Sequence, residues 1–376
     1  MIPAGWKSAS LADICNFIEK GKRKASFGKN RGQFIFVPSA LTTKYCDEAD
    51  YVETSIVLGD GGVANVHYVD TPFSASDHTY VLREKDKSIV VLKYVYYNLL
   101  ANIEHIQKGF GGAAIKNVSK TYLKNTPIIY PDLPEQQRIV AKLDTLFADI
   151  EKEKQVVQQN LQNAKELFES ELNKLFTENT GWEHKKLSEV AIDFGRGKSK
   201  HRPRNDKCLY GGPYPFIQTG DIRNSKHYIT SYTQTYNETG LAQSKLWPKG
   251  TLCITIAANI AETGILDFDA CFPDSVIGCT FDNNKTNACF VEYLLQSFKS
   301  VLQAKGKGSA QDNINLGTFE NQFFPFPEKS VQDRIVQKLD TLREQIQELE
   351  QIYTQQIADL DELKQAILKK AFNGEL

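Results

Sequence analysis

Two stretches of the chain place apolar residues at every third or fourth position, with Lys, Glu, Gln and Asp between them. This spacing predicts two amphipathic helices, each about 40 residues and therefore roughly 60 Å long. A stripe of that length cannot be buried on one small domain, so it needs a partner helix, and we predict that the two helices pair. The residues expected at this interface are Ile139, Leu143, Leu146, Ile150, Ile335, Leu339, Leu342 and Ile346.

The stripes leave the direction of pairing open, but the connection between the helices favours an antiparallel pair. The second helix must return along the first, because a globular segment lies between them. The simpler alternative is that each helix packs only on its own domain. The resulting division is a first domain at 1–132, a central helix at 133–177, a second domain at 178–327 and a distal helix at 328–376.

The two globular parts are rich in Tyr, Phe, Val, Thr and Gly. Their short apolar runs, separated by Gly, Pro, Asn and Asp, predict strands. Segments 92–106 and 290–302 have the pattern of helices. We therefore expect an α+β fold in which strands dominate. The runs that predict strands include 35–37, 80–82, 216–217, 252–256 and 276–277.

The chain repeats itself. The segment from Arg138 to Leu146 returns from Arg334 to Leu342, 196 residues later, with eight of nine positions identical. The match extends backward to Gln136 and Gln332. Such a long interval exceeds the roughly 20–50 residues of solenoid repeats, so it indicates a duplicated module of one domain and one long helix.

Composition restricts the cellular compartment and the kind of nucleic-acid site that the chain can have. No apolar run approaches the roughly 20 residues that span a bilayer, and the first residues lack the layout of a signal peptide. Seven cysteines without a Cys-x-x-Cys pair indicate reduced thiols in a cytoplasmic protein. A net charge of -1 means that any nucleic-acid site must be a local patch.

Basic residues gather near the start of each domain, among Gly and Ser. Flexible basic loops can neutralise phosphates, and arginine can pair with guanine through two hydrogen bonds. A solvated loop is the alternative for either segment alone, but the matched placement in both domains favours DNA contact. The candidate DNA-binding residues are Lys22, Arg23, Lys24, Lys29, Arg31, Arg196, Lys198, Lys200, Arg202 and Arg204.

The sequence offers no convincing catalytic group and no metal-ligand motif. Gly197-Lys198-Ser199 resembles the end of a phosphate-binding loop, but Ile192 stands where that loop needs glycine. Asp77 and Asp274 occupy similar places in the two domains. A role in a turn is favoured for both over a catalytic one.

This layout resembles the specificity subunit of Type I restriction–modification systems, over essentially the whole chain. The resemblance rests on Leu133-Pro134-Glu135-Gln136-Gln137-Arg138-Ile139-Val140, Phe272-Pro273-Asp274-Ser275, Gly308-Ser309-Ala310-Gln311 followed by Asn313, and the ending from Gln365 to Leu376. One departure is Ile115, which replaces the glutamine of the third motif in the first domain.

The resemblance implies two target-recognition domains, each reading one half of a bipartite, asymmetric site in double-stranded DNA. It also implies a pair of spacer helices that dock two adenine-N6 methyltransferase subunits. Those subunits would bring S-adenosylmethionine, so this chain would bind no cofactor and would not be an enzyme. Whether two restriction ATPase–nuclease subunits join is left open, and no membrane contact is expected.

Three other functions remain as alternatives. A stand-alone DNA-binding regulator would bind its site without another subunit. A coiled-coil adaptor would show no salt-dependent affinity for DNA. An enzyme would use Asp77 and Asp274, and alanine at both positions would abolish its turnover.

Overall fold

The protein is described by a computed structural model that covers residues 2–112, 116–177, 181–201, 203–257, 260–306, 317, 319 and 321–376. The third motif of the resemblance, and Ile115, lie outside these residues. The chain divides into two compact units. The first comprises 1–159 and 353–376, and the second comprises 160–352.

The described part of the first domain is built on a four-stranded antiparallel sheet, a three-stranded sheet and two short two-stranded pairs. Its main core lies between the four-stranded sheet and the helix α2, with Ile56, Leu82 and Val95 fully buried. The strands are β1 Lys7–Ser10, β2 Cys15–Lys20, β3 Phe34–Val37, β4 Lys44–Cys46, β5 Ser55–Gly59, β6 Val66–Val69, β7 Phe73–Ala75, β8 Thr79–Glu84, β9 Phe110–Gly111, β10 Asn117–Val118 and β11 Pro127–Tyr130. The helices are α1 Leu11–Ile14, η1 Ala25–Phe27, α2 Leu92–Ala101, α3 Ile103–Lys108 and α4 Lys120–Lys124.

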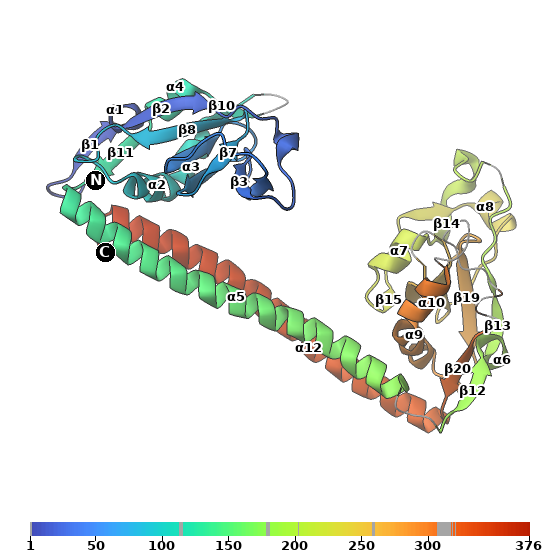
Figure 1. The fold of residues 1–376 in the computed structure, drawn as a ribbon. Coiled ribbons are helices and arrows are strands. Elements are labelled where there is room, and N and C mark those ends of the chain that lie inside the picture. The colour runs from blue at the N-terminus through green and yellow to red at the C-terminus, as the bar shows by residue number, and fades with distance from the viewer. Residues whose placement is uncertain are drawn as a thin grey trace. The chain divides into compact units, whose positions relative to one another are not determined.

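The second domain repeats this plan with a five-stranded sheet in the order β13-β19-β17-β18-β15, counted over its described residues. A separate pair, β14 with β16, lies at the end of the domain away from β12 and β20 (Figure 1). The strands are β12 Glu183–Lys186, β13 Ala191–Arg196, β14 Tyr210–Phe216, β15 Tyr228–Ile229, β16 Gln234–Tyr236, β17 Leu252–Thr255, β18 Thr263–Leu266, β19 Val276–Phe281 and β20 Phe323–Phe326. The helices are α6 Leu187–Val190, η2 Lys207–Leu209, α7 Thr219–Asn224, α8 Glu238–Ala242, α9 Ala288–Ser297 and α10 Lys299–Gly306.

The segments expected to be single helices at 92–106 and 290–302 are each broken into two. In the first, the break falls at Asn102, whose side-chain amide donates to the backbone oxygen of Asn98 at 2.9 Å. An asparagine that binds the backbone of the preceding turn competes with helix continuation. In the second, Phe298 ends α9 with φ -90° and ψ 0°. Apolar spacing alone does not detect either break.

The two long helices are α5, Leu133–Thr177, and α12, Lys329–Phe372. They lie side by side and run in opposite directions (Figure 1). In the first unit Lys154 of α5 pairs with Asp361 of α12 at 2.8 Å, and in the second Glu171 pairs with Lys338 at 3.0 Å. From the first pair to the second, the residue number rises along α5 and falls along α12. The predicted antiparallel pairing is therefore confirmed.

The apolar stripes also meet the domains, as the simpler alternative expected. In the first unit one cluster joins residues of α2, α5 and α12, represented by Tyr94, Leu143 and Leu368, each 0% exposed. In the second unit Leu339 belongs to the core of the domain itself. Of the residues expected at the helix interface, Ile139, Leu143, Ile150, Ile335, Leu339 and Ile346 are buried, while Leu146 and Leu342 are half-buried.

A buried glutamine fastens each long helix to its domain. The Gln136 side-chain oxygen accepts the backbone N–H of Val91 at 2.9 Å, just before α2. The Gln136 side-chain nitrogen donates to the backbone oxygens of Ile89 and Pro131, each at 3.0 Å. Because all three partners are backbone groups, this contact does not depend on which side chains the domain carries.

The second module makes the same contact 196 positions later. Gln332 accepts the backbone N–H of Asn287 at 2.9 Å, just before α9, and donates to the backbone oxygen of Pro327 at 2.9 Å. We call this set of glutamine bonds the glutamine latch. It explains why the glutamine recurs although the residues it binds, Val91 and Asn287, differ.

A tyrosine–aspartate bond accompanies each latch. Tyr97 of α2 donates its hydroxyl to Asp144 of α5. At the matching positions, Tyr293 of α9 donates to Asp340 of α12 at 2.5 Å. Both aspartates belong to the nine-residue repeat, so part of that repeat is retained for packing the helix on its domain.

Replacing Gln136 with leucine tests the latch. The change keeps the side-chain volume but leaves the Val91 N–H and the carbonyl oxygens of Ile89 and Pro131, in buried or partly buried places, without this partner. Each such group costs about 1–3 kcal/mol, so we expect the free energy of unfolding of the first unit to fall by roughly 3 kcal/mol. Urea titration followed by circular dichroism measures it. The neighbouring Gln137 is exposed, and Gln137→Leu should stay within about 0.5 kcal/mol of the parent. Equal effects of the two variants would refute the latch.

Candidate nucleic-acid interface

Each basic loop leaves its domain at the same structural position. The first follows β2 and the second follows β13, and both strands lie at the edge of their sheets. Each strand is paired antiparallel with the strand that follows an acidic turn, β8 after Asp77 and β19 after Asp274. The fold therefore places each basic loop against the acidic turn of its own domain, which holds Asp77 in the first domain and Asp274 in the second.

A glycine at the start of each loop allows this close approach. A Cβ atom added at Gly21 would lie closer than 3.0 Å to the backbone oxygens of Ala75 and Ser76. One added at Gly197 would lie as close to the backbone oxygens of Phe272 and Pro273. Only a residue without a side chain lets the backbone of the loop contact the backbone of the turn.

The second loop is held to its turn by Asp274. Arg196 donates its Nε to the backbone oxygen of Asp274 at 2.6 Å. Arg204 pairs with the Asp274 carboxylate at 2.7 Å, with its own side chain 48% exposed. Two of the candidate arginines therefore shape the loop, and Arg204 still presents half of its surface to solvent. The observed role of Asp274 is to bind the loop.

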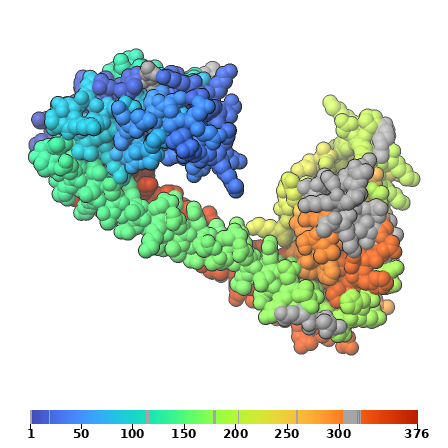
Figure 2. All heavy atoms as spheres, viewed as in Figure 1, coloured from blue at the N-terminus to red at the C-terminus, as the bar shows by residue number. Residues whose placement is uncertain are grey.

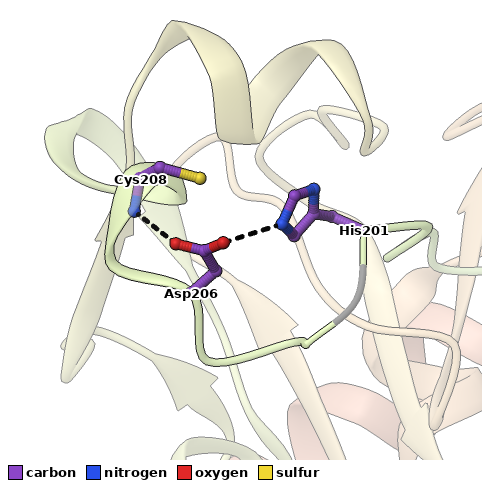
Figure 3. Close-up of side chains that lie close together, drawn as sticks. All are labelled: His201, Asp206 and Cys208. Carbon is purple, nitrogen blue, oxygen red and sulfur yellow. Dashed lines mark hydrogen bonds and ion pairs between the residues drawn. The ribbon is translucent and has the colours of Figure 1, made fainter.

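The middle of the second loop forms a hydrogen-bonded turn (Figure 3). His201 Nε2 and an Asp206 carboxylate oxygen lie 3.0 Å apart, and the other oxygen accepts the backbone N–H of Cys208 at 3.0 Å. The Cys208 N–H, followed by the His201 bond, lowers the pKa of Asp206 to about 2. Asp206 is therefore ionised at neutral pH and caps the short helix η2.

These three side chains also offer one metal-ligand atom each, within 4.8 Å of one another. Over the described residues they form the single cluster of three such groups. The sequence showed no sign of it, because His201, Asp206 and Cys208 do not have the spacing of a known metal motif. The hydrogen bonds account for the arrangement, and we assign it a structural role.

The first loop is held by a different set of contacts. Arg23 makes two bonds to the Asp50 carboxylate, at 2.8 and 2.9 Å, and one to Glu48 at 2.7 Å. Its guanidinium also lies 4.6 Å from the centre of the Phe27 ring. Lys29 pairs with Asp47 at 2.6 Å. Arg23, one of the candidate DNA-binding arginines, thus has most of its donors bound within the domain.

The remaining candidates differ in what they can offer DNA. Arg202 lies outside the described residues. Lys22 is exposed. Among the described residues, four candidates are exposed and have no ion-pair partner within the chain. They are Lys24, Arg31, Lys198 and Lys200. Their charges are the ones most available to phosphate.

Two further observations concern the cysteines and the apolar character of the helices. All seven cysteines are free thiols. None of the helices in the described ranges has the length and apolar character needed to cross a membrane.

Comparison with known proteins identifies the class. The family model of the Type I restriction modification DNA specificity domain matches residues 3–159 and 179–358. The chain belongs to this family and carries its domain twice. It is 23% identical to the Type I restriction enzyme EcoDI specificity subunit of Escherichia coli, covering 100% of this chain and 89% of that protein. It is 22% identical to the StySPI specificity subunit of Salmonella potsdam, covering 100% and 90%.

Solved structures support the fold. A chain from work on complex assembly and conformational transition of the type I R-M system matches with a TM-score of 0.77 and 20% identity, over 100% of both chains. The HsdS subunit from Thermoanaerobacter tengcongensis matches with a TM-score of 0.58 and 20% identity, over 100% of this chain and 98% of that one. The two recognition domains and the helix pair are therefore a fold shared with these proteins.

The glycine contact yields a test. In Gly197→Ala the added methyl group meets two backbone oxygens, so we expect the second unit to lose about 2–4 kcal/mol of unfolding free energy. Thermal unfolding followed by circular dichroism measures the loss. Gly195, two residues earlier and near the end of β13, has no atom within 4 Å of an added Cβ. Gly195→Ala should leave the melting temperature unchanged or slightly higher. A Gly197→Ala protein as stable as Gly195→Ala would contradict the close approach.

Proposed function

We propose that this chain gives a Type I restriction–modification complex its DNA sequence specificity. The observation that carries the proposal is the duplicated module. Each copy holds a recognition domain with a basic loop, fastened to a long helix by the same glutamine latch and tyrosine–aspartate bond. Two similar modules in one chain suit a DNA target made of two parts.

Each domain would read a different half-site. The loops share their position and their glycine, but the contacts that shape them differ. Arg23 binds Asp50 and Glu48 in the first, whereas Arg196 and Arg204 bind Asp274 in the second. Lys24, Lys198, Lys200 and Arg31 would bind phosphates and fix the register of the domain on the DNA. Contacts to base edges would supply the sequence preference.

The helices would dock two adenine-N6 methyltransferase subunits, one on each module. Support comes from three positions of the repeat whose side chains lie outside the apolar cores of the two units. Their side chains are exposed in both copies and are spaced by four and three positions, which places them on one helix face. They are Arg138, Lys142 and Thr145 in α5, and Arg334, Lys338 and Thr341 in α12.

Side chains of α5 are uncovered along one flank in the space-filling view (Figure 2). In the second unit, Arg334, Lys338 and Thr341 line a groove of about 620 Å³ together with Leu167, which is 49% exposed. Two identical exposed stripes are expected if two copies of one partner bind. In this proposal the chain performs no chemistry, and the methyltransferase subunits bring S-adenosylmethionine. Restriction ATPase–nuclease subunits are further proposed partners of the same complex.

The proposal is tested by co-expressing the chain with its partner methyltransferase subunit in a host without N6-methyladenine, then mapping that base across the genome. We expect one bipartite, asymmetric motif, with one methylated adenine in each half. The methyltransferase expressed alone is the control and should give no such motif. A chain that adds no methylation yet binds DNA in a salt-dependent way would favour a stand-alone regulator. A chain without either property would favour an adaptor.

A further inference from the structure

A polar cavity of about 350 Å³ opens beside the basic loop of the second domain. It lies between three segments that are distant in sequence: the loop, the strand pair β14–β16 and the acidic turn. Its walls include Arg204 and Asn205 from the loop, Gln234 from β16, Gln218 at the start of α7 just after β14, and Ser275 from the turn. Each of these segments therefore contributes a hydrogen-bonding group to the wall of the cavity.

Two glutamines in this wall hold each other. The Gln218 side-chain nitrogen donates to the Gln234 side-chain oxygen at 2.7 Å. That bond uses one donor of Gln218 and the oxygen of Gln234. The Gln218 oxygen and the Gln234 NH₂ group remain, so the pair offers an acceptor beside a donor.

The backbone fixes both glutamines. The Gln218 N–H donates to the Asp221 carboxylate at 2.8 Å, at the start of α7. Gln234 is the register partner of Phe216 in the β14–β16 pair. Behind them, Phe216 stacks on the fully buried Tyr236 with ring centres 4.1 Å apart. The amides therefore stand on a rigid support, as a base-reading group requires.

An acceptor and a donor side by side match one base edge in the major groove. Adenine presents the N6 amino donor next to the N7 acceptor, and amide side chains bind both at once. Lys198 and Lys200, exposed on the adjoining loop, are placed to bind the neighbouring phosphates. The cavity thus combines a base-edge reader with phosphate contacts on the same loop.

We propose that this cavity is a base-reading site of the second domain, and that Gln218 and Gln234 determine its specificity by binding an adenine. The inference rests on the proposed function, because it assigns a position within the half-site that the second domain reads. Arg204 is held by its ion pair with Asp274 and lines the cavity beside the two amides. We do not assign it a contact with the adenine.

The decisive variant is Gln234→Glu, tested in the complete complex with the methyltransferase subunit. Glutamate keeps the size of the side chain and still accepts the Gln218 bond, but it removes the outward NH₂ donor. We expect discrimination for adenine at one position of one half-site to fall by about tenfold to a hundredfold, with the other half-site unchanged. Mapping N6-methyladenine across the genome measures both half-sites at once.

Gln218→Ala should relax the same position. Asn224→Ala is the matched control, since Asn224 is an exposed amide on α7 outside the cavity, and it should leave the motif intact. The proposal is overturned if Gln234→Glu and Gln218→Ala both retain the parent motif, or if they weaken methylation equally at all sites. Failure of the parent complex to give a bipartite motif would instead remove the proposed function, so the two failures are distinguishable.

Discussion

The structure depends on the attachment of each long helix to a small domain through a buried glutamine that binds backbone groups. A helix of about 40 residues is not stabilised by its own amphipathic pattern, because most helical stability comes from packing. Here one end of each helix is fastened by a glutamine that binds one backbone N–H and at least one backbone carbonyl group. Since the glutamine binds backbone, the domain can change its side chains without losing the helix. This separates the part of the chain that must stay constant from the part that can vary.

This division between a constant helix and a variable domain explains which residues are the same in both modules. In the nine-residue repeat, Asp144 and Asp340 bind a tyrosine of the domain, and buried Leu143 and Leu339 pack beneath them. Ile139 and Ile335 of the repeat are also buried, whereas Arg138, Lys142 and Thr145, with their counterparts in α12, are exposed. The loops that face DNA in our proposal are instead held by contacts that differ between the copies. A constant scaffold carrying variable loops is the arrangement expected of a protein whose specificity changes while its partners remain the same.

The sequence was sufficient for features set by local periodicity or by repetition. Helical spacing predicted α5 and α12, and the connection between them predicted their antiparallel pairing. Apolar runs located strands such as β8, β17 and β19. Contacts between distant residues could not be foreseen, because no local pattern encodes them. Arg23 lies 27 residues from Asp50, and Arg204 lies 70 residues from Asp274, so only the fold reveals that these arginines are partly committed. The same holds for Gln218 and Gln234, which no motif had singled out.

In our proposal the two modules are equivalent attachment sites for one kind of partner. The most direct measurement is the mass of the complex formed with the methyltransferase subunit, determined by native mass spectrometry without DNA. Two methyltransferase subunits for each copy of this chain is the predicted result. A single methyltransferase subunit per chain, persisting at saturating concentration, would contradict the equivalence of the two exposed stripes and the account built on it.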